Sequence, residues 1–327
     1  MSAATMPKRY RNWDGMEARP RVVTIGTFDG VHLGHHYLAG ETVKRAQALN
    51  VPALAVTFEP IPAMVLRPDL FPGRICSAEE KLERLSMAGL DEIATLAFSR
   101  SLSELSAEAF LEQMHRCAQP VELWVGEAFA LGRNRSGDLP KLLEIGRRLG
   151  FNVHAVKRLA DDDGIVSSSV IRRAVQAGDV ARAERLLGRP FRVTGPVIHG
   201  AHLGRTIGYP TANVQPAPDL VPLADGIYAT RATIPDVVSD HPAMTYVGTR
   251  PTVNTGARLV ETHLLDFDGD LYGRPLHVDL LERLREDATF DGLDALVAQL
   301  NLDEEATRQY FAGRGAVGTT ISPSPSD

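Results

Sequence analysis

Two histidines inside a glycine-rich stretch are the residues of this chain best placed, by type and spacing, to act on a phosphate. His32 and His35 lie within residues 26–36, which read GTFDGVHLGHH. Because they are three residues apart, their imidazoles would share one side of a helix's first turn. The glycines let a ligand approach the backbone, and a helix that begins here would present unpaired N–H groups to it. The stretch therefore predicts a polyphosphate site in which two imidazoles stabilise developing charge.

Two plainer interpretations of this stretch stay open from the residues alone. A glycine-rich turn between a strand and a helix also occurs without any nucleotide. A pair of histidines at this spacing can be half of a metal site, although no cluster of Cys, His or carboxylate residues nearby would supply more ligands.

Alternating strand and helix patterns supply the elements that would position this turn. Ser77 and Asp138 can cap two later helices, and Gly150 can end the second of them. Such alternation predicts an α/β domain with a doubly wound, mostly parallel sheet, which binds ligands beyond the carboxyl ends of its strands. The predicted strands are Val22–Thr27, Ala53–Phe58, Glu92–Phe98, Val121–Val125 and Phe151–Val156.

Three further loops fall where these predicted elements meet. The segments Thr57–Pro62 and Val125–Gly132 follow the second and fourth strands. Ser167 and Ser168 can cap a helix that carries Arg172 in its first turns. A cation there opposes the helix dipole unless it shares an anion, which indicates a phosphate partner. Taken alone, each loop is equally typical of solvated chain.

The pattern changes after a short linker at Leu187–Pro190. Beyond it, strand-like runs separated by turns predict a small antiparallel β-barrel, followed by an amphipathic helix over Phe290–Phe311. The predicted strands are Arg192–Ile198, Gly226–Ile234, Ala243–Val247, Leu259–Phe267 and Pro275–Leu284. The expected regions are an extension at 1–20, an α/β domain at 21–187, a β-barrel domain at 188–313 and a disordered tail at 314–327.

A second candidate site lies in residues 195–213 of this β-rich half. Glycines and a basic side chain there are typical of a phosphate loop, but the spacing is not that of a Walker motif. Thr211 and Asn213 would share a face of an extended segment, and their oxygens suit Mg²⁺. As a bare pattern, this Pro-Thr-Ala-Asn segment can also be only a turn.

Several motifs together resemble one family. The GTFDGVHLGH stretch is similar to the His-x-Gly-His signature of nucleotidyltransferases, in the longer form found in bacterial bifunctional riboflavin kinase/FAD synthetases. Ser168 and Arg172 match that family's Ser-Ser-x-x-Arg signature. Gly204-Arg205 followed by GYPTAN at 208–213 resembles the riboflavin kinase signature. The resemblance covers about residues 21 to 312 in family order and implies a Rossmann-like nucleotidyltransferase domain followed by a riboflavin kinase barrel.

For the second half, the resemblance implies ATP-dependent phosphorylation of riboflavin to FMN. Glu261 matches the catalytic base that would activate the ribityl hydroxyl. Thr211 and Asn213 would hold Mg²⁺. The implied phosphate-binding residues are Gly200, Gly204 and Arg205, and the implied flavin-binding residues are Gly208, Tyr209 and Arg285.

For the first half, the resemblance implies adenylylation of FMN to FAD with release of pyrophosphate. The FMN phosphate is already anionic, so no base is needed, and His32, His35 and Arg172 would stabilise the developing charge with Mg²⁺. The implied ATP-binding residues are Gly26, Thr27, Phe28, Gly34, Ser167 and Ser168, and Phe129 is the implied flavin contact.

The chain departs from the family pattern at three positions of the first half. Ile61 replaces a histidine, Ala128 replaces an Asp or Asn, and Leu131 stands where an aromatic is common. Each lost contact is worth roughly 1–3 kcal/mol. One alternative is therefore a competent kinase with a weakened or differently selective adenylyltransferase half. Another is a non-catalytic flavin-binding protein, against which an intact Glu261 argues.

The totals fit a two-domain enzyme of small phosphorylated substrates. A chain of 327 residues with 44% hydrophobic and 23% charged residues can bury two cores, and a net charge of −6 argues against a general nucleic-acid surface. The 2 cysteines, Cys76 and Cys117, have no metal-type spacing. The sequence has no apolar run long enough to cross a membrane. We expect a cytoplasmic enzyme of riboflavin, FMN and ATP that is a monomer or a weak homo-oligomer.

Overall fold

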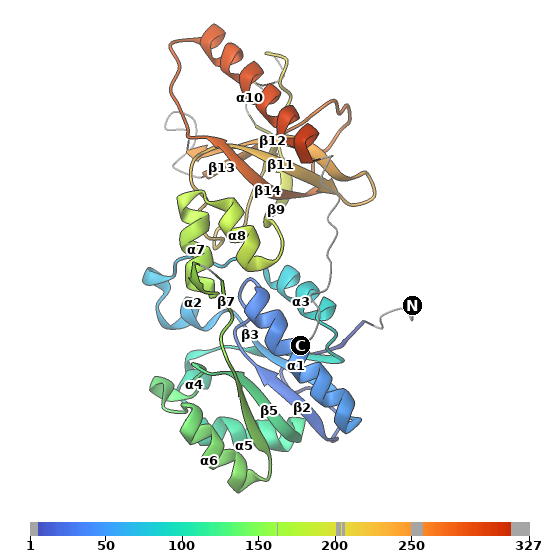
Figure 1. Cartoon of the computed structure of the whole chain (residues 1–327), viewed down its shortest axis with the longest axis vertical. Helices are drawn as coiled ribbons and strands as arrows, with labels where there is room; N and C mark the ends of the chain where they lie inside the picture. Colours follow the sequence, from blue (N-terminus) through green and yellow to red (C-terminus); the bar gives the residue numbers. More distant parts are fainter. Residues whose placement is uncertain (1–5, 162, 201–203, 205–206, 250–257, 315–327) are drawn as a thin grey trace, which may run out of the picture. The chain divides into compact units, whose positions relative to one another are not determined.

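The chain divides into two compact units (Figure 1). The computed structural model describes residues 6–161, 163–200, 204, 207–249 and 258–314. The first unit holds most of the chain up to Arg172 and, from further along, Leu186–Gly188 and Asp219–Val221. The second unit holds the remainder.

The first unit is built on a six-stranded sheet in the order β1-β4-β3-β2-β5-β6. Every pairing in this sheet is parallel, which confirms the predicted doubly wound architecture. The central strand β2 is buried along its whole length because helices cover both faces. The strands are β1 Lys8–Arg11, β2 Arg21–Ile25, β3 Ala53–Glu59, β4 Glu92–Ala97, β5 Pro120–Gly126 and β6 Asn152–Val156.

Alternate residues of β2 face two different hydrophobic cores. Val22 packs with α1 (Leu33–Leu49) and α3 (Ala78–Met87), whereas Val23 packs with α5 (Ala107–Ala118) and α6 (Leu139–Leu149). Figure 1 shows α1 and the pair α5 and α6 on opposite sides of these strands. The shorter elements of this unit are α2 Pro62–Leu66, η1 Pro68–Leu70, α4 Arg100–Ser103, η2 Arg133–Arg135, β7 Ala160–Asp161 and β8 Gly164–Ile165.

The predicted helix signals of the first half are confirmed. The Ser77 hydroxyl accepts from the backbone N–H of Glu80 at 3.0 Å, and the Asp138 carboxylate accepts from that of Lys141 at 3.1 Å. Gly150 ends α6 in the left-handed conformation, with a φ of 86°.

One strand lies inside the segment expected to be an extension. The residues of β1 pair in parallel with β4, where Tyr10 donates to buried Glu92 at 2.8 Å. Arg19 also donates to Glu92 at 2.6 Å, and fully buried Arg21 forms an ion pair with it. The sequence of this strand, KRYR, shows no alternation of apolar and polar residues that would predict it, and Tyr10 is its one buried residue.

The second unit contains the predicted closed antiparallel barrel, in the order β10-β13-β12-β11-β14-β9. The strand β13 ends at Leu264 rather than at the predicted Phe267, since Asp266 has a φ of 54°, which turns the chain. The strands are β9 Phe191–Ile198, β10 Ala212–Val214, β11 Gly226–Ile234, β12 Val238–Thr249, β13 Arg258–Leu264 and β14 Pro275–Arg285.

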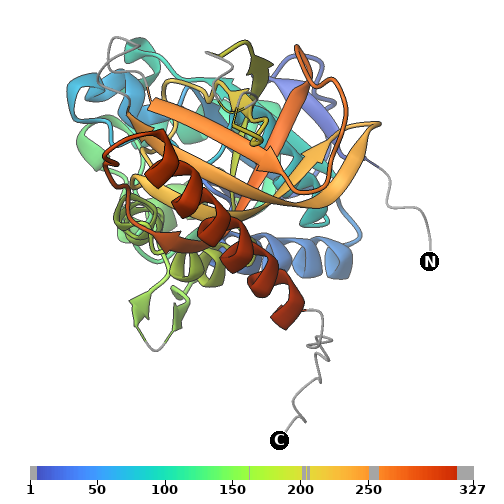
Figure 2. The ribbon, with the colours of Figure 1, turned by 90° about the horizontal axis from the view of Figure 1, so that it is seen from above.

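Further helices lie in the second half of the chain. Gly178, with a φ of 77°, separates α7 (Ser168–Ala177) from α8 (Val180–Leu187). The C-terminal helix α10 (Leu293–Arg314) lies across the outside of the barrel and contacts β11, β12 and β14 (Figure 2). In the part of the chain that the structure describes, none of the helices is both long and apolar enough to span a membrane.

Candidate active sites

The glycine-rich turn has a backbone shape that few sequences can adopt. Strand β2 ends at Ile25, and Phe28 and Val31 then have φ values of 51° and 38°, although neither is glycine. Gly30 has a φ of 79°, and a Cβ there would lie 2.8 Å from the Ile75 side chain. Both Phe28 and Val31 are fully buried, so core packing holds the turn in this conformation.

The two predicted histidines are brought together at the start of α1. Their rings stack with centroids 3.6 Å apart, and Phe28 meets the His35 ring edge-on at 5.1 Å. Gly34 lies against the His32 ring, because a Cβ at Gly34 would be 3.2 Å from it. Burial, together with the nearby imidazoles of His32 and His36, holds the pKa of His35 well below its usual value. A neutral His35 can donate one hydrogen bond to a phosphate.

The predicted Ser-Ser-x-x-Arg segment also reaches this turn. The Ser167 hydroxyl accepts from the Val170 backbone at 3.4 Å as a cap of α7, and Ser168 donates its hydroxyl to the Asp29 carbonyl at 3.0 Å. Arg172 forms an ion pair with Asp29 and donates from Nε to the Gly73 carbonyl at 2.7 Å. The serines and Arg172 therefore lie beside the histidine turn, as the motif order predicts.

Asp29 is a functional candidate that the sequence analysis missed. Its carboxylate also accepts from the backbone N–H of Ile75 at 3.0 Å. Burial raises the pKa of Asp29, while the charge of Arg172 opposes that shift. Its place inside the GTFDG stretch was the available signal, but its partners are 46 and 143 residues away in the chain.

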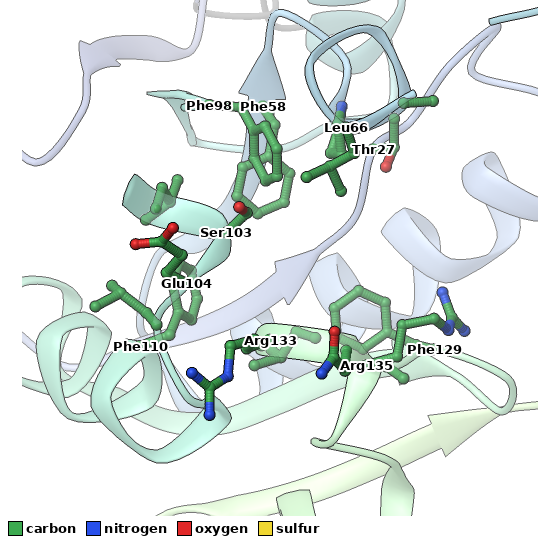
Figure 3. Close-up of a pocket in the computed structure, with 18 of the residues that line it drawn as sticks. Thr27, Phe58, Leu66, Phe98, Ser103, Glu104, Phe110, Phe129, Arg133 and Arg135 are labelled. Carbon is green, nitrogen blue, oxygen red and sulfur yellow. The ribbon is translucent and has the colours of Figure 1, made fainter. Parts of the chain in front are cut away.

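A cavity of about 900 Å³ opens beyond the carboxyl ends of β3, β4 and β5. Figure 3 shows aromatic side chains facing it from several elements, among them the predicted flavin contact Phe129. Its other notable lining residues, which sequence reasoning did not single out, are Phe58, Phe98, Phe110, Arg133 and Arg135. An apolar cavity with a few cationic groups is suited to a large planar ligand that carries phosphate.

The three departures from the family pattern have different surroundings. Ile61 is 4% exposed at the start of α2, so its side chain belongs to the core. Leu131 lines the cavity and exchanges backbone hydrogen bonds with Gly137 at 3.1 and 2.9 Å. The Ala128 carbonyl accepts from the Arg135 guanidinium at 3.2 Å.

In the second unit, the predicted phosphate and metal residues converge on β10. A Cβ at Gly200 would lie 2.4 Å from the Asn213 amide, and one at Gly204 would lie 3.4 Å from the Thr211 hydroxyl oxygen. Asn213 pairs with Glu261 of β13 in the barrel register, so both residues point to the same face of the sheet. The predicted Arg205 lies outside the described residues.

The predicted flavin residues lie close to α10. Gly208, with a φ of 86°, turns the chain into Tyr209, whose hydroxyl donates to Asn301 of α10 at 2.5 Å. Arg285 forms two 2.8 Å hydrogen bonds with buried Asp303 of α10. Neither of these links to the helix is predicted by the sequence.

A second cavity, of about 460 Å³, lies beside the Pro-Thr-Ala-Asn segment. Its lining includes Pro210, Thr211, Thr262, Asp268 and Tyr272. Within the described residues there is no group of three or more His, Cys, Asp or Glu side chains arranged to hold a metal ion.

Comparison with known proteins assigns each half. A family model described as FAD synthetase matches residues 15–170, and one described as riboflavin kinase matches residues 187–311. A bifunctional riboflavin kinase/FMN adenylyltransferase from Pseudomonas fluorescens is 41% identical over 298 residues, which cover 90% of this chain and 94% of that protein. The chain belongs to the bifunctional riboflavin kinase/FMN adenylyltransferase family.

Further relatives agree with this assignment. The protein of the same description from Escherichia coli K12 is 36% identical over 291 residues, covering 89% of this chain and 92% of that one. A solved structure titled as a macrolide-efflux protein from Streptococcus pneumoniae is 31% identical, with a TM-score of 0.82 over 93% of this chain and 99% of that chain. Its fold matches that of this chain, although its title names a different function from flavin synthesis, which both family models describe.

The family's two reactions are the function of this chain. It phosphorylates riboflavin to FMN and adenylylates FMN to FAD, and both reactions use ATP. Nothing in these relatives favours a flavin carrier or a weakened adenylyltransferase half.

Proposed function

We propose that FMN is adenylylated at the histidine turn of the first unit and that riboflavin is phosphorylated between β10 and β13 of the second. The observation that carries the first assignment is the convergence of His32, His35, Ser168 and Arg172 at one strand end. Glu261 facing the same side as Asn213 supports the second assignment.

In adenylyl transfer, an oxygen of the FMN phosphate attacks the α-phosphorus of ATP. The new P–O bond forms as the bond to the β-phosphate oxygen breaks, and pyrophosphate leaves with its electron pair. His32 and His35 donate hydrogen bonds to the phosphates, and the N-terminus of α1 adds its own N–H groups. Arg172 reaches the phosphates by exchanging part of its ion pair with Asp29 for them, and the aromatic cavity holds the flavin ring through Phe129.

In the kinase step, Glu261 accepts the proton of the ribityl 5′-hydroxyl while the oxygen attacks the γ-phosphorus of ATP and ADP leaves. A carboxylate suits this role because an alcohol is a weak nucleophile until it loses its proton. Gly200 and Gly204 bring backbone close to the phosphates, and Tyr209 and Arg285 border the flavin.

Mg²⁺ fits the oxygen donors of the second unit. The Asn213 amide lies against Gly200 and the Thr211 hydroxyl against Gly204. A side chain at either glycine would occupy the space beside these oxygen donors. Hard oxygen ligands of this kind bind Mg²⁺ together with substrate phosphates rather than in an all-protein cage. We assign Thr211 and Asn213 as its ligands; when bound, the cation supplies charge neutralisation on the transferred phosphate.

The wider assignments are proposals of the same kind. The expected domain limits at 21–187 and 188–313 follow the composition change at the linker; the compact units differ from them in that β1 joins the first unit and Arg173–Arg185 the second. A cytoplasmic site of action agrees with the use of ATP and with two cysteines, Cys76 and Cys117, that are not joined in a disulfide. We assign the protein as a monomer or weak homo-oligomer.

Chromatography that resolves riboflavin, FMN and FAD tests these roles with two variants. With riboflavin and Mg-ATP, Glu261→Gln should form FMN at least ~10²-fold more slowly, since the amide cannot accept a proton. The same variant supplied with FMN should form FAD at the wild-type rate. His32→Ala should show the reverse pattern. A variant that loses both activities equally would contradict the assignment of its residue to one reaction.

A further inference from the structure

A three-residue segment of the second half of the sequence belongs to the first unit. Asp219–Val221 lies in the chain between the barrel strands β10 and β11. The Arg74 N–H donates to the Asp219 carbonyl at 2.7 Å, and the Val221 N–H donates to the Arg74 carbonyl at 2.8 Å. Arg74 and Leu220 thereby form a parallel bridge. We call Asp219–Val221 the strap.

The strap fits closely against the residue before Arg74. Gly73 has a φ of 91°, and a Cβ there would lie 2.4 Å from the Val221 Cα. Val221 itself is 2% exposed. The contact is therefore packed backbone against backbone, which leaves Gly73 little freedom to move.

Charge complementarity adds to this backbone pairing. The Arg74 side chain is buried, with Nε 3.0 Å from an Asp219 carboxylate oxygen and Nη2 2.6 Å from a Glu59 carboxylate oxygen. Burial alone would lower the pKa of Arg74, but the hydrogen bond to Glu59 and the charges of Glu59 and Asp219 raise it. Removing Asp219 would leave a buried cation with one partner fewer.

The residues on either side of Arg74 support the phosphate-binding turn. The Gly73 carbonyl accepts from Arg172 Nε at 2.7 Å, and the Ile75 N–H donates to the Asp29 carboxylate at 3.0 Å. Arg172 and Asp29 are the ion pair at the histidine turn. Both members of that pair are thus aligned by one short segment, and the strap fixes that segment.

We propose that Asp219 is a positioning residue for adenylyl transfer, which acts through Arg74 on the Gly73 carbonyl and the Ile75 amide that align Arg172 and Asp29. This inference rests on the proposed role of Arg172. If Asp219 has this role, the adenylyltransferase site depends on a residue that lies, in the sequence, between two strands of the kinase barrel.

The test uses full-length Asp219→Ala, with both reactions measured on one preparation. The kcat of FMN adenylylation should fall roughly ten- to hundredfold, since small displacements of aligned groups cost that much, with the KM for FMN unchanged. Riboflavin phosphorylation should not change. Asp219→Glu should recover most of the lost activity, and Gln215→Ala, an exposed position of the same loop, should behave as wild type. If Asp219→Ala is insoluble, Asp219→Asn removes the charge and keeps the size.

Combination with Arg172→Ala separates this proposal from the one on which it rests. In the Arg172→Ala background, Asp219→Ala should add little further loss, because both changes act on one alignment. Fully additive losses, or unchanged adenylylation in Asp219→Ala, would overturn the strap proposal alone. Unchanged adenylylation in Arg172→Ala would instead overturn the proposed role of Arg172.

Discussion

At the residue scale, the phosphate-binding turn depends on side chains and glycines that tolerate an uncommon backbone. Phe28 and Val31 hold positive φ values, and Gly30 between them lies against Ile75. Such conformations cost energy that the surrounding core must supply. The turn is therefore rigid before any nucleotide binds, which is the arrangement that electrostatic stabilisation of a transition state requires.

Gly30→Ala should damage both stability and FMN adenylylation. The new methyl group would meet Ile75 while the backbone keeps a φ of 79°, so we expect a loss of about 2–4 kcal/mol in the free energy of unfolding. Gly15→Ala is the matched control, since its φ is 69° and a Cβ there has nothing within 4 Å. Urea unfolding compares them. Equal losses in the two variants would show that the contact with Ile75 is unimportant.

His35 should make stability fall in mild acid. Its pKa is depressed in the folded protein from 6.5, so the unfolded chain binds more protons below that value. The free energy of unfolding therefore decreases as the pH falls through about 6.5 toward the depressed pKa, by up to about 1.4 kcal/mol per pH unit. Urea unfolding of wild type and His35→Gln at several pH values isolates this contribution. Identical slopes in both proteins would mean that His35 ionises as freely when folded as when unfolded.

At the element scale, apolar periodicity and caps predicted most of the architecture. The sheet, the barrel and the helices capped by Ser77 and Asp138 follow from local patterns that tertiary packing reinforces. Strand β1 was missed because its partner β4, rather than its own pattern, holds it in the sheet. The end of β13 was predicted three residues too late, because the alternation of polar and apolar residues does not show that Asp266 adopts the left-handed conformation.

Only those residues of the candidate sites that belong to a sequence motif could be predicted. His32 and His35 at the start of α1, and Arg172 in α7, could be predicted because each belongs to a local sequence motif. Asp29 and the strap were missed, since their importance comes from contacts between residues distant in sequence. No local pattern encodes such contacts.

The link between α10 and the barrel should matter to the kinase. Asp303 is 4% exposed at its side chain and forms a bidentate pair with Arg285. Asp303→Ala leaves that guanidinium without its carboxylate partner, so we expect a loss of about 3 kcal/mol in stability and a raised KM for riboflavin. Arg308→Ala is the control on the same helix: it breaks exposed pairs with Asp266, which follows β13, and with Glu304, and should have a much smaller effect. Thermal unfolding measures the loss of stability, and riboflavin titration measures the KM. Similar effects of the two variants would contradict a special role for the pair of Asp303 and Arg285.

At the scale of the whole molecule, one chain with two compact units carries out two consecutive reactions. The second unit has its own closed barrel and its own candidate catalytic residues. Residues Arg173–Arg185 belong to that unit, where Gly178 lies against the Arg283 side chain.

A fragment comprising residues 187–313 should fold and convert riboflavin to FMN. A longer fragment that starts at residue 173 should be more stable, since it keeps a segment that belongs to this unit. Circular dichroism and the chromatographic assay check both fragments. If neither fragment is active while the full chain is, the kinase unit is not autonomous.

Mixing two variants of the full chain, each of which lacks one of the two activities, tests the central claim, which is that two separate sites act in sequence. Glu261→Gln alone, given riboflavin and Mg-ATP, should make almost no FMN, and His32→Ala alone should stop at FMN. Their mixture should make FAD, because FMN released by His32→Ala enters the intact adenylyltransferase site of Glu261→Gln. A mixture that stops at FMN, or FAD formed by either variant alone at the wild-type rate, would contradict the account.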